Sequence, residues 1–115
     1  MIEEGQIVLF RFPQTDLKEG KLRPALVIRK TPGEYDDWLI CMISSRLHQK
    51  HTELDEVIGP EDKDFTDSGL KTISVIRCSR LAVIEQSILL GKLGNISPER
   101  LQKIKDKISK WIREA

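Results

Sequence analysis

The chain has 115 residues, of which 39% are hydrophobic and 32% are charged, and its formal net charge is +1. This length and composition are typical of a soluble globular protein, and we expect one domain over residues 1–115. The small net charge excludes a global basic field, so any nucleic-acid site must come from local charge placement. No apolar run approaches the ~20 residues that cross a membrane, and the acidic residues 1–4 lack the apolar core of a secretion signal.

The first predicted strand covers residues 6–12 and ends at Pro13. A polar loop follows over residues 14–22, and it is longer than a tight hairpin needs. Loops of this length often carry function, although a plain connector would show the same pattern. The charged residues of this loop are Asp16, Lys18, Glu19 and Lys21.

Two short apolar runs, residues 25–28 and 38–43, predict buried strands that form a central hairpin around a Pro-Gly turn. Arg23 precedes the first strand, and Ser44 and Ser45 end the second. An antiparallel hairpin brings these two ends side by side. A guanidinium next to hydroxyl groups suits a phosphate. A solvated arginine and two loop serines are the alternative, since both residue types are common on surfaces.

The loop after Ser45 contains both histidines of the chain, His48 and His51, together with Arg46 and Lys50. Two histidines three residues apart would need further ligands to hold zinc, and neither a cysteine nor an HExxH pattern lies nearby. We therefore expect no metal. The cations favour contact with a nucleic-acid backbone, with ordinary solvated charge as the alternative.

The next segments predict further strands. Residues 52–58 alternate, which indicates a half-exposed edge strand, and residues 61–68 contain a short helical turn. Extended segments follow at residues 70–79, 81–84 and 88–93. Within them Arg77 shares a face with apolar side chains, which is unfavourable for a charge unless it reaches a rim or a partner. Cys41 and Cys78 lie in apolar runs, as expected of buried free thiols in a reducing cytoplasm.

A helix is predicted from Ser97, a good N-cap that is followed by Pro98 and Glu99. Its apolar stripe is expected to pack on the sheet rather than on a membrane. The stripe consists of Leu101, Ile104, Ile108, Trp111 and Ile112. Many short strands followed by one helix predict a mainly β fold, a small antiparallel barrel capped by a C-terminal helix.

Five segments in this order resemble the MazF/PemK (also Kid) family, the toxins of type II toxin–antitoxin systems. They are GQIV at residues 5–8, RPALVI at 23–28, ISS at 43–45, SVIRC at 74–78 and ISPE at 96–99. The resemblance extends from about residue 5 to about residue 112, and no single motif carries it.

The resemblance implies an SH3-like β-barrel that forms a homodimer in the cytoplasm. It implies a sequence-selective endoribonuclease without metal or cofactor, which cleaves single-stranded RNA. In that reaction the 2′-OH attacks the adjacent phosphate and leaves a 2′,3′-cyclic phosphate and a 5′-OH. It also implies a cognate antitoxin, through whose complex operator DNA is contacted.

Carried over residue by residue, the resemblance assigns catalysis to Arg23, Ser44 and Arg77. Two guanidinium groups can stabilise the charge that develops on a phosphorane, and a guanidinium is a poor proton donor. Contacts with RNA are expected from Arg11, Lys21, Ser45, Arg46, His48, Lys50 and Ser79.

The general base is where the sequence departs from the family pattern. Ser79 stands where one branch has an aspartate, Leu17 where that branch has a histidine, and Lys18 where the other branch has a glutamate. Glu19 is the first candidate for the base and Asp16 the second. His48 or His51 is the third, because imidazole titrates near neutral pH. The alternative function is a catalytically weak module of this fold that binds RNA, DNA or protein.

Overall fold

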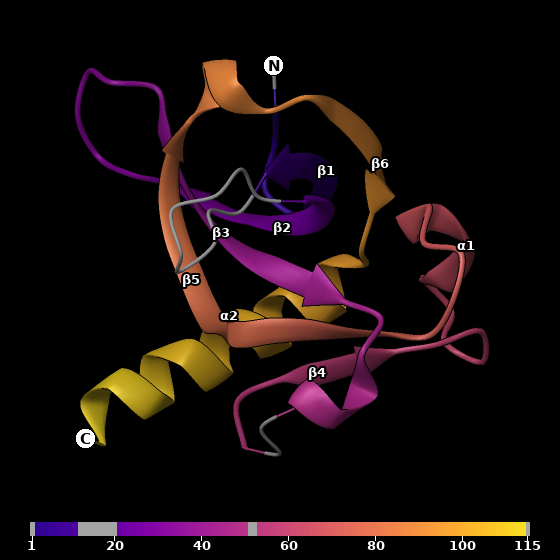
Figure 1. Ribbon diagram of the computed structural model, residues 1–115. Coiled ribbons are helices and arrows are strands. Elements are labelled where there is room, and N and C mark those ends of the chain that lie inside the picture. Colours follow the sequence, from indigo (N-terminus) through magenta and orange to yellow (C-terminus); the bar gives the residue numbers. More distant parts are fainter. Residues whose placement is uncertain (1, 12–20, 51–52, 115) are drawn as a thin grey trace.

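The computed structural model describes residues 2–11, 21–50 and 53–114. These residues form a six-stranded antiparallel sheet with the strand order β4-β5-β3-β2-β1-β6, which curls into a half-barrel (Figure 1). The expected mainly β fold with a C-terminal helix is thus confirmed. The strands are β1 (Gln6–Arg11), β2 (Leu22–Lys30), β3 (Asp37–Ser44), β4 (Glu56–Ile58), β5 (Ser74–Glu85) and β6 (Gly91–Asn95). The helices are α1 (Phe65–Ser68) and α2 (Pro98–Arg113), with 3-10 turns η1 (Leu47–Gln49) and η2 (Gln86–Ile88).

The β2–β3 hairpin lies in the middle of the sheet, as the two apolar runs predicted. Ala25 pairs with Met42 and Lys30 with Trp38. The turn between the strands uses Gly33 at a φ of 115°, a conformation that side chains other than glycine rarely adopt. β1 pairs with β2 on one side of the hairpin, and β5 pairs with β3 on the other.

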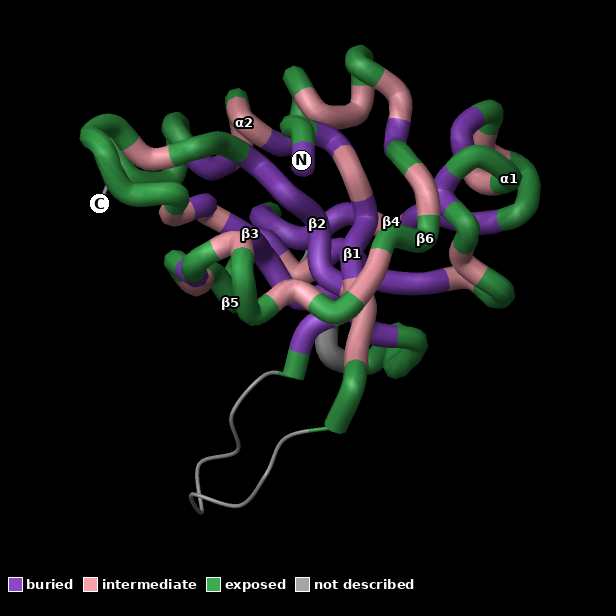
Figure 2. The backbone as a smooth tube through the Cα atoms, turned by 90° about the horizontal axis from the view of Figure 1, so that it is seen from above, coloured by how far each residue is buried: buried purple, intermediate pink, exposed green. Residues whose placement is uncertain are grey.

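Each face of the sheet carries its own apolar cluster, because successive side chains of a strand point to opposite faces. One cluster includes Leu26, Ile43 and Ile76, and α2 covers it with Ile104 and Ile108. The other cluster lies on the face away from α2 and consists of Ile2, Val8, Phe10, Ala25, Val27, Trp38, Ile40, Met42 and Ile84. Figure 2 shows buried residues concentrated along β1, β2 and β3, the strands that contribute side chains to both clusters.

Helix α2 begins where the sequence predicted. The Ser97 hydroxyl accepts a hydrogen bond from the Arg100 backbone N–H at 3.1 Å, and Pro98 is the first helical residue. The predicted apolar stripe is only partly correct. Trp111 and Ile112 are 56% and 59% exposed, because the last turn of α2 extends beyond the side chains that bury Ile104 and Ile108.

The two edges of the sheet, β4 and β6, are linked through α1, which follows β4 in the chain and packs on β6. The backbones of α1 and β6 approach each other closely at two glycines. A Cβ on Gly69 would overlap Leu93. A Cβ on Gly94 would overlap Asp67 and lie 2.7 Å from the Ser68 carbonyl carbon. Only glycine allows this approach. The predicted strand over residues 88–93 is shifted: η2 occupies its start, and β6 begins at Gly91.

The expectation of a half-exposed strand over residues 52–58 is wrong in its burial, although β4 is an edge strand. Asp55 is fully buried and Glu56 is 5% exposed. The alternation of polar and apolar residues suggested solvent on one side. In the folded chain, however, cationic side chains of α2 cover Glu56, and Ser79 of β5 binds the Asp55 carboxylate.

Candidate functional site

Arg23 and Arg77 lie on the same face of the sheet although they come from strands that are not neighbours. Met42 of β3 lies between them, because it pairs with Ala25 of β2 on one side and with Arg77 of β5 on the other. Residues directly opposite each other in antiparallel strands point to the same face, as do residues two apart in one strand. Arg23, two residues before Ala25, therefore shares this face, and both arginine side chains are half-buried.

Ser44 ends β3 on the same face, two residues beyond Met42. It pairs with Val75 and is 2% exposed. Its hydroxyl accepts a hydrogen bond from the Arg46 backbone N–H at 3.1 Å, which fixes the turn where the chain leaves the sheet. A hydroxyl that accepts one hydrogen bond still has a proton to donate. The hairpin thus brings Arg23 and Ser44 to one end of the sheet, as the sequence predicted, and β5 adds Arg77.

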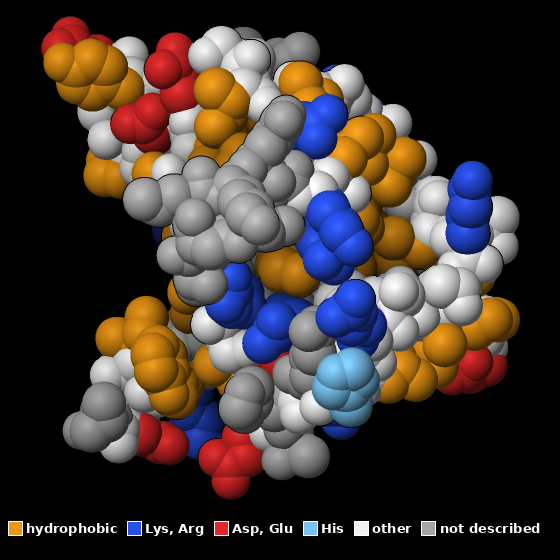
Figure 3. Space-filling model, in the orientation of Figure 1, with side chains coloured by type: hydrophobic (Ala, Val, Ile, Leu, Met, Phe, Trp, Pro, Cys, Tyr) orange, Lys and Arg blue, Asp and Glu red, His pale blue; other side chains and the backbone are white. Residues whose placement is uncertain are grey.

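The chain after Ser44 lies on the surface beside this end of the sheet. The side chains of Ser45, Arg46, His48 and Lys50 are all exposed, and the Lys50 N–H donates to the Leu47 carbonyl oxygen at 3.2 Å to close η1. Figure 3 shows Lys and Arg side chains gathered in the middle of one face of the molecule, next to a histidine. Local cationic charge therefore exists despite the small net charge of the chain.

Other residues predicted to contact RNA are placed differently. Lys21 is exposed directly before β2. Arg11 is exposed at the end of β1 opposite Leu22, so strand alternation directs it to the other face from Arg23. Ser79 donates its backbone N–H and its hydroxyl to the Asp55 carboxylate at 2.9 and 3.1 Å. The RNA contacts of these residues stay predictions.

Three of the four candidates for the general base, Glu19, Asp16 and His51, lie outside the described residues. His48 is the fourth, and its side chain is exposed on η1. Of the predicted site, the structure therefore describes the two arginines, the serines and the cationic loop after β3.

A sequence model of PemK-like, MazF-like toxins of type II toxin–antitoxin systems matches residues 3–112. The chain belongs to this family. No curated protein matches the chain at a significant level. Membership makes the protein the toxin component of a type II system and implies an antitoxin as its partner.

One residue of this PemK-like toxin that sequence reasoning did not select is Asp55. Both carboxylate oxygens bind Ser79, two residues after Arg77, and the side chain is fully buried. This contact could not be predicted from the sequence, because the alternating pattern around Asp55 indicated a half-exposed strand. An aspartate in a strand segment is the only unusual feature, since this residue type is depleted in strands.

The toxin's second charged cluster lies on the opposite side of the sheet and is centred on Arg100 of α2. The Arg100 guanidinium contacts Asp64 at 2.8 Å, Glu56 at 3.0 Å and Asp62 at 3.4 Å. Burial disfavours the Asp64 carboxylate, but hydrogen bonds from Arg100 and from the Ser97 N–H outweigh it and lower the pKa of Asp64. These contacts join α2 to β4 and to the segment before α1.

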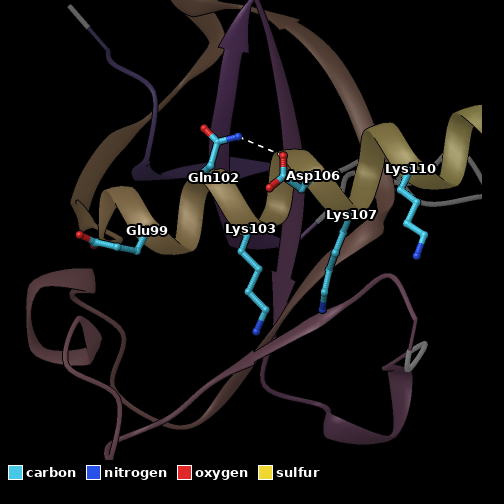
Figure 4. A pocket seen from close by; sticks show the side chains of 6 residues that line it. All are labelled: Glu99, Gln102, Lys103, Asp106, Lys107 and Lys110. Carbon is cyan, nitrogen blue, oxygen red and sulfur yellow. Dashed lines mark hydrogen bonds between the residues drawn. The ribbon is translucent and has the colours of Figure 1, made fainter.

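A row of lysines on α2 extends this cluster. Figure 4 shows Lys103, Lys107 and Lys110 directed to one side of the helix, where they line a shallow hollow of about 610 Å³. Lys107 contacts Glu56 at 3.1 Å and Lys103 contacts it at 3.7 Å, so two of the three lysines balance a buried carboxylate. We assign this row to the attachment of α2 rather than to the reaction.

The remaining polar groups of the toxin do not form a metal centre in the part of the chain that the structure describes, where no cluster of three or more His, Cys, Asp or Glu side chains could hold an ion. Cys41 and Cys78 are free and buried, as predicted. A hydrogen bond with Cys78, together with burial, raises the pKa of Cys41 well above its ordinary value. Among the described residues, no helix is both long and apolar enough to span a membrane.

Proposed function

We propose that this toxin is a sequence-selective endoribonuclease that cleaves single-stranded RNA without a metal ion or cofactor. The observation that carries the proposal is the placement of Arg23, Ser44 and Arg77 on one face and at one end of the sheet. Two guanidinium groups and a hydroxyl in such an arrangement can surround one phosphodiester. Membership in a toxin family supports the same activity.

In the proposed reaction the ribose 2′-oxygen loses its proton to a base and forms a bond to the adjacent phosphorus. The bond from phosphorus to the 5′-oxygen breaks, and that oxygen takes up a proton and leaves as a 5′-OH. The products are a 2′,3′-cyclic phosphate and a new 5′ end. Arg23 and Arg77 stabilise the additional negative charge on the non-bridging oxygens, and Ser44 donates a hydrogen bond to one of them.

The base is assigned to one of four residues: Glu19, Asp16, His48 or His51. A carboxylate base and an imidazole base give different dependences of rate on pH, because their protonation ranges differ. A rate that falls only below about pH 5 favours Glu19 or Asp16, and one that falls below about pH 7 favours a histidine. Substitution of each candidate then identifies the residue.

Recognition of the RNA strand is assigned to the cationic surface beside the arginines. Exposed Ser45, Arg46, His48 and Lys50 follow β3, and Lys21 precedes β2. Arg11 and Ser79 complete the proposed contact set. Contacts from Lys and Arg to phosphates release counterions, so we expect RNA affinity to fall as salt rises.

We further propose that the toxin acts as a homodimer in the cytoplasm and is blocked by an antitoxin, whose complex contacts operator DNA. Exposed apolar side chains offer surface for protein partners. Val83 on the second half of β5 is 57% exposed, and Leu90 after η2 is 58% exposed. Sedimentation equilibrium tests the dimer, and a strictly monomeric protein would contradict it.

Expression in cells tests the toxin activity. We expect growth to stop on induction, because an RNA-cleaving enzyme depletes messages, and we expect Arg23→Ala to restore growth at the same protein level. The chain departs from the family pattern at the positions expected for the general base. This departure favours a second candidate function, an RNA-binding module without catalysis. Cells that tolerate the unaltered protein, together with RNA binding that weakens with salt, would favour this second candidate.

A further inference from the structure

The buried carboxylate of Asp55 lies next to the proposed phosphate site and binds Ser79. Its Oδ1 accepts the backbone N–H of Ser79 at 2.9 Å, and its Oδ2 accepts the Ser79 hydroxyl at 3.1 Å. Asp55 precedes Glu56, which pairs with Ile76. The same register, continued by one residue, brings Asp55 beside Arg77 and onto the same face of the sheet.

The segment that Asp55 binds is an irregular part of β5. Arg77 pairs with Met42, but the next residue of β3, Cys41, pairs with Leu81, so that residues 78–80 form a bulge. A bulge interrupts the ladder and leaves backbone groups without a partner in the neighbouring strand. Ser79 lies in the middle of the bulge, and Asp55 supplies the acceptor for its N–H. The bulge begins directly after Arg77, so its shape sets the direction of the strand at that residue.

Asp55 itself is held from the far side of the sheet. Lys107 of α2 donates to the Asp55 carbonyl oxygen at 3.5 Å and contacts the neighbouring Glu56 at 3.1 Å. Arg100 fixes Glu56 with a second contact at 3.0 Å. Contacts on the α2 side thus hold the backbone from which the Asp55 carboxylate extends.

We propose that Asp55 is a positioning residue for RNA cleavage: through Ser79 it fixes the bulge of β5 and thereby the direction of Arg77. This inference rests on the proposed endoribonuclease function. Asp55 binds both the backbone N–H and the hydroxyl of Ser79, so the contribution proposed for it is the geometry of the bulge. Displacement of a group that stabilises the transition state lowers kcat, and a shift of about 1 Å can cost about 10²-fold.

Two substitutions at Asp55 separate geometry from charge. Asp55→Asn keeps an oxygen to accept the Ser79 N–H and an amide to donate to the Ser79 hydroxyl, so it should retain most of kcat. Asp55→Ala removes both hydrogen bonds and should lower kcat about 10²-fold with little change in KM.

Asp64 provides the matched control. It is also a buried aspartate whose carboxylate accepts a serine backbone N–H, that of Ser97 at 3.0 Å. Asp64 precedes α1, however, and its partner Ser97 is the N-cap of α2, on the other side of the sheet from the proposed phosphate site. Asp64→Ala should lower stability without a selective loss of kcat in the protein that remains folded. Equal loss of kcat in Asp55→Ala and Asp64→Ala would overturn the proposal, because a general loss of stability would then explain both.

A second measurement decides the proposal even without catalysis. NMR resonances of the Ser79 amide and the Arg77 Nε–H should shift in Asp55→Ala, and hydrogen exchange at Ser79 should accelerate, whereas Asp64→Ala should leave both resonances in place. If the unaltered protein cleaves no RNA, the proposed function is wrong. The spectra then still test whether Asp55 fixes the bulge of β5 and the direction of Arg77. Unchanged Arg77 and Ser79 resonances in Asp55→Ala, or a loss of kcat in Asp55→Asn as large as in Asp55→Ala, would overturn the positioning role.

Discussion

Arg77 of β5 lies directly opposite Met42 of β3 in the sheet. Because Met42 also lies opposite Ala25 of β2, this pairing places a second arginine on the face that carries Arg23. The two guanidinium groups come from distant parts of the sequence and meet only through the β3 strand between them. The proposed chemistry depends on this pairing, because it brings the second guanidinium group to the proposed phosphate site.

Arg77→Ala should lower kcat about 10²–10³-fold, the usual effect of removing one donor that stabilises developing charge. Arg77→Lys should recover only part of the loss, because an ammonium keeps the charge but not the planar fork that binds two phosphate oxygens. Single-turnover cleavage of a short RNA measures both. Equal activity of the lysine variant and the unaltered protein would show that charge alone suffices.

Arg100→Ala should destabilise the protein by about 3–5 kcal/mol, because it leaves the buried Glu56 and Asp64 carboxylates without their main partner. Lys103→Ala is the control on the same helix. The Lys103 side chain is 64% exposed, so its loss should cost about 0–1 kcal/mol. Urea unfolding measures the difference, and similar costs for the two variants would contradict the importance of the buried cluster.

Asp64 should make stability sensitive to acid. Its pKa is lowered in the folded state, so it stabilises the fold fully above its unfolded pKa of about 3.9 and loses that contribution as the pH falls through the folded value. The free energy of unfolding should therefore fall between about pH 5 and pH 2. Asp64→Asn should show a smaller fall over the same range, and parallel pH profiles for the two proteins would contradict this assignment.

Gly94→Ala should destabilise the protein by about 3 kcal/mol, because the new Cβ would overlap backbone atoms of Asp67 and Ser68 in α1 and force the backbone to shift. Gly91→Ala lies in the same strand, but its Cβ would meet only Leu9 at an ordinary 3.7 Å. Its effect should stay within about 0.5 kcal/mol. Thermal unfolding compares the two, and a tolerated Gly94→Ala would show that the contact between α1 and β6 yields easily.

The parts of the fold that sequence could predict are those with local signals. The central hairpin follows from two apolar runs around a Pro-Gly turn, and the start of α2 follows from Ser97 and Pro98. The end of the apolar stripe could not be predicted, because Trp111 and Ile112 continue the helical period although their side chains remain exposed. Periodicity predicts which side chains share one face of a helix. It does not predict how far along the helix that face is covered by the sheet.

The candidate site was predictable to a similar extent. The hairpin geometry alone brought Arg23 and Ser44 together, and the charge of Arg77 on an apolar face indicated a special position. The burial of Asp55 and Glu56 was missed, because their partners Ser79 and Arg100 lie 24 and 44 residues further along the chain. Contacts of this kind depend on the register of β4 with β5 and on the placement of α2, which no local pattern encodes.

The most direct test of the proposed function is incubation of the purified protein with a long unstructured RNA in EDTA, followed by mapping of the new 5′ ends. Arg23→Ala and Arg77→Ala run beside the unaltered protein. The proposal predicts cleavage at a short recurring sequence, with 5′-OH ends, and its loss in both variants. Intact RNA, cleavage that requires a metal ion, or full activity in both variants would contradict the account.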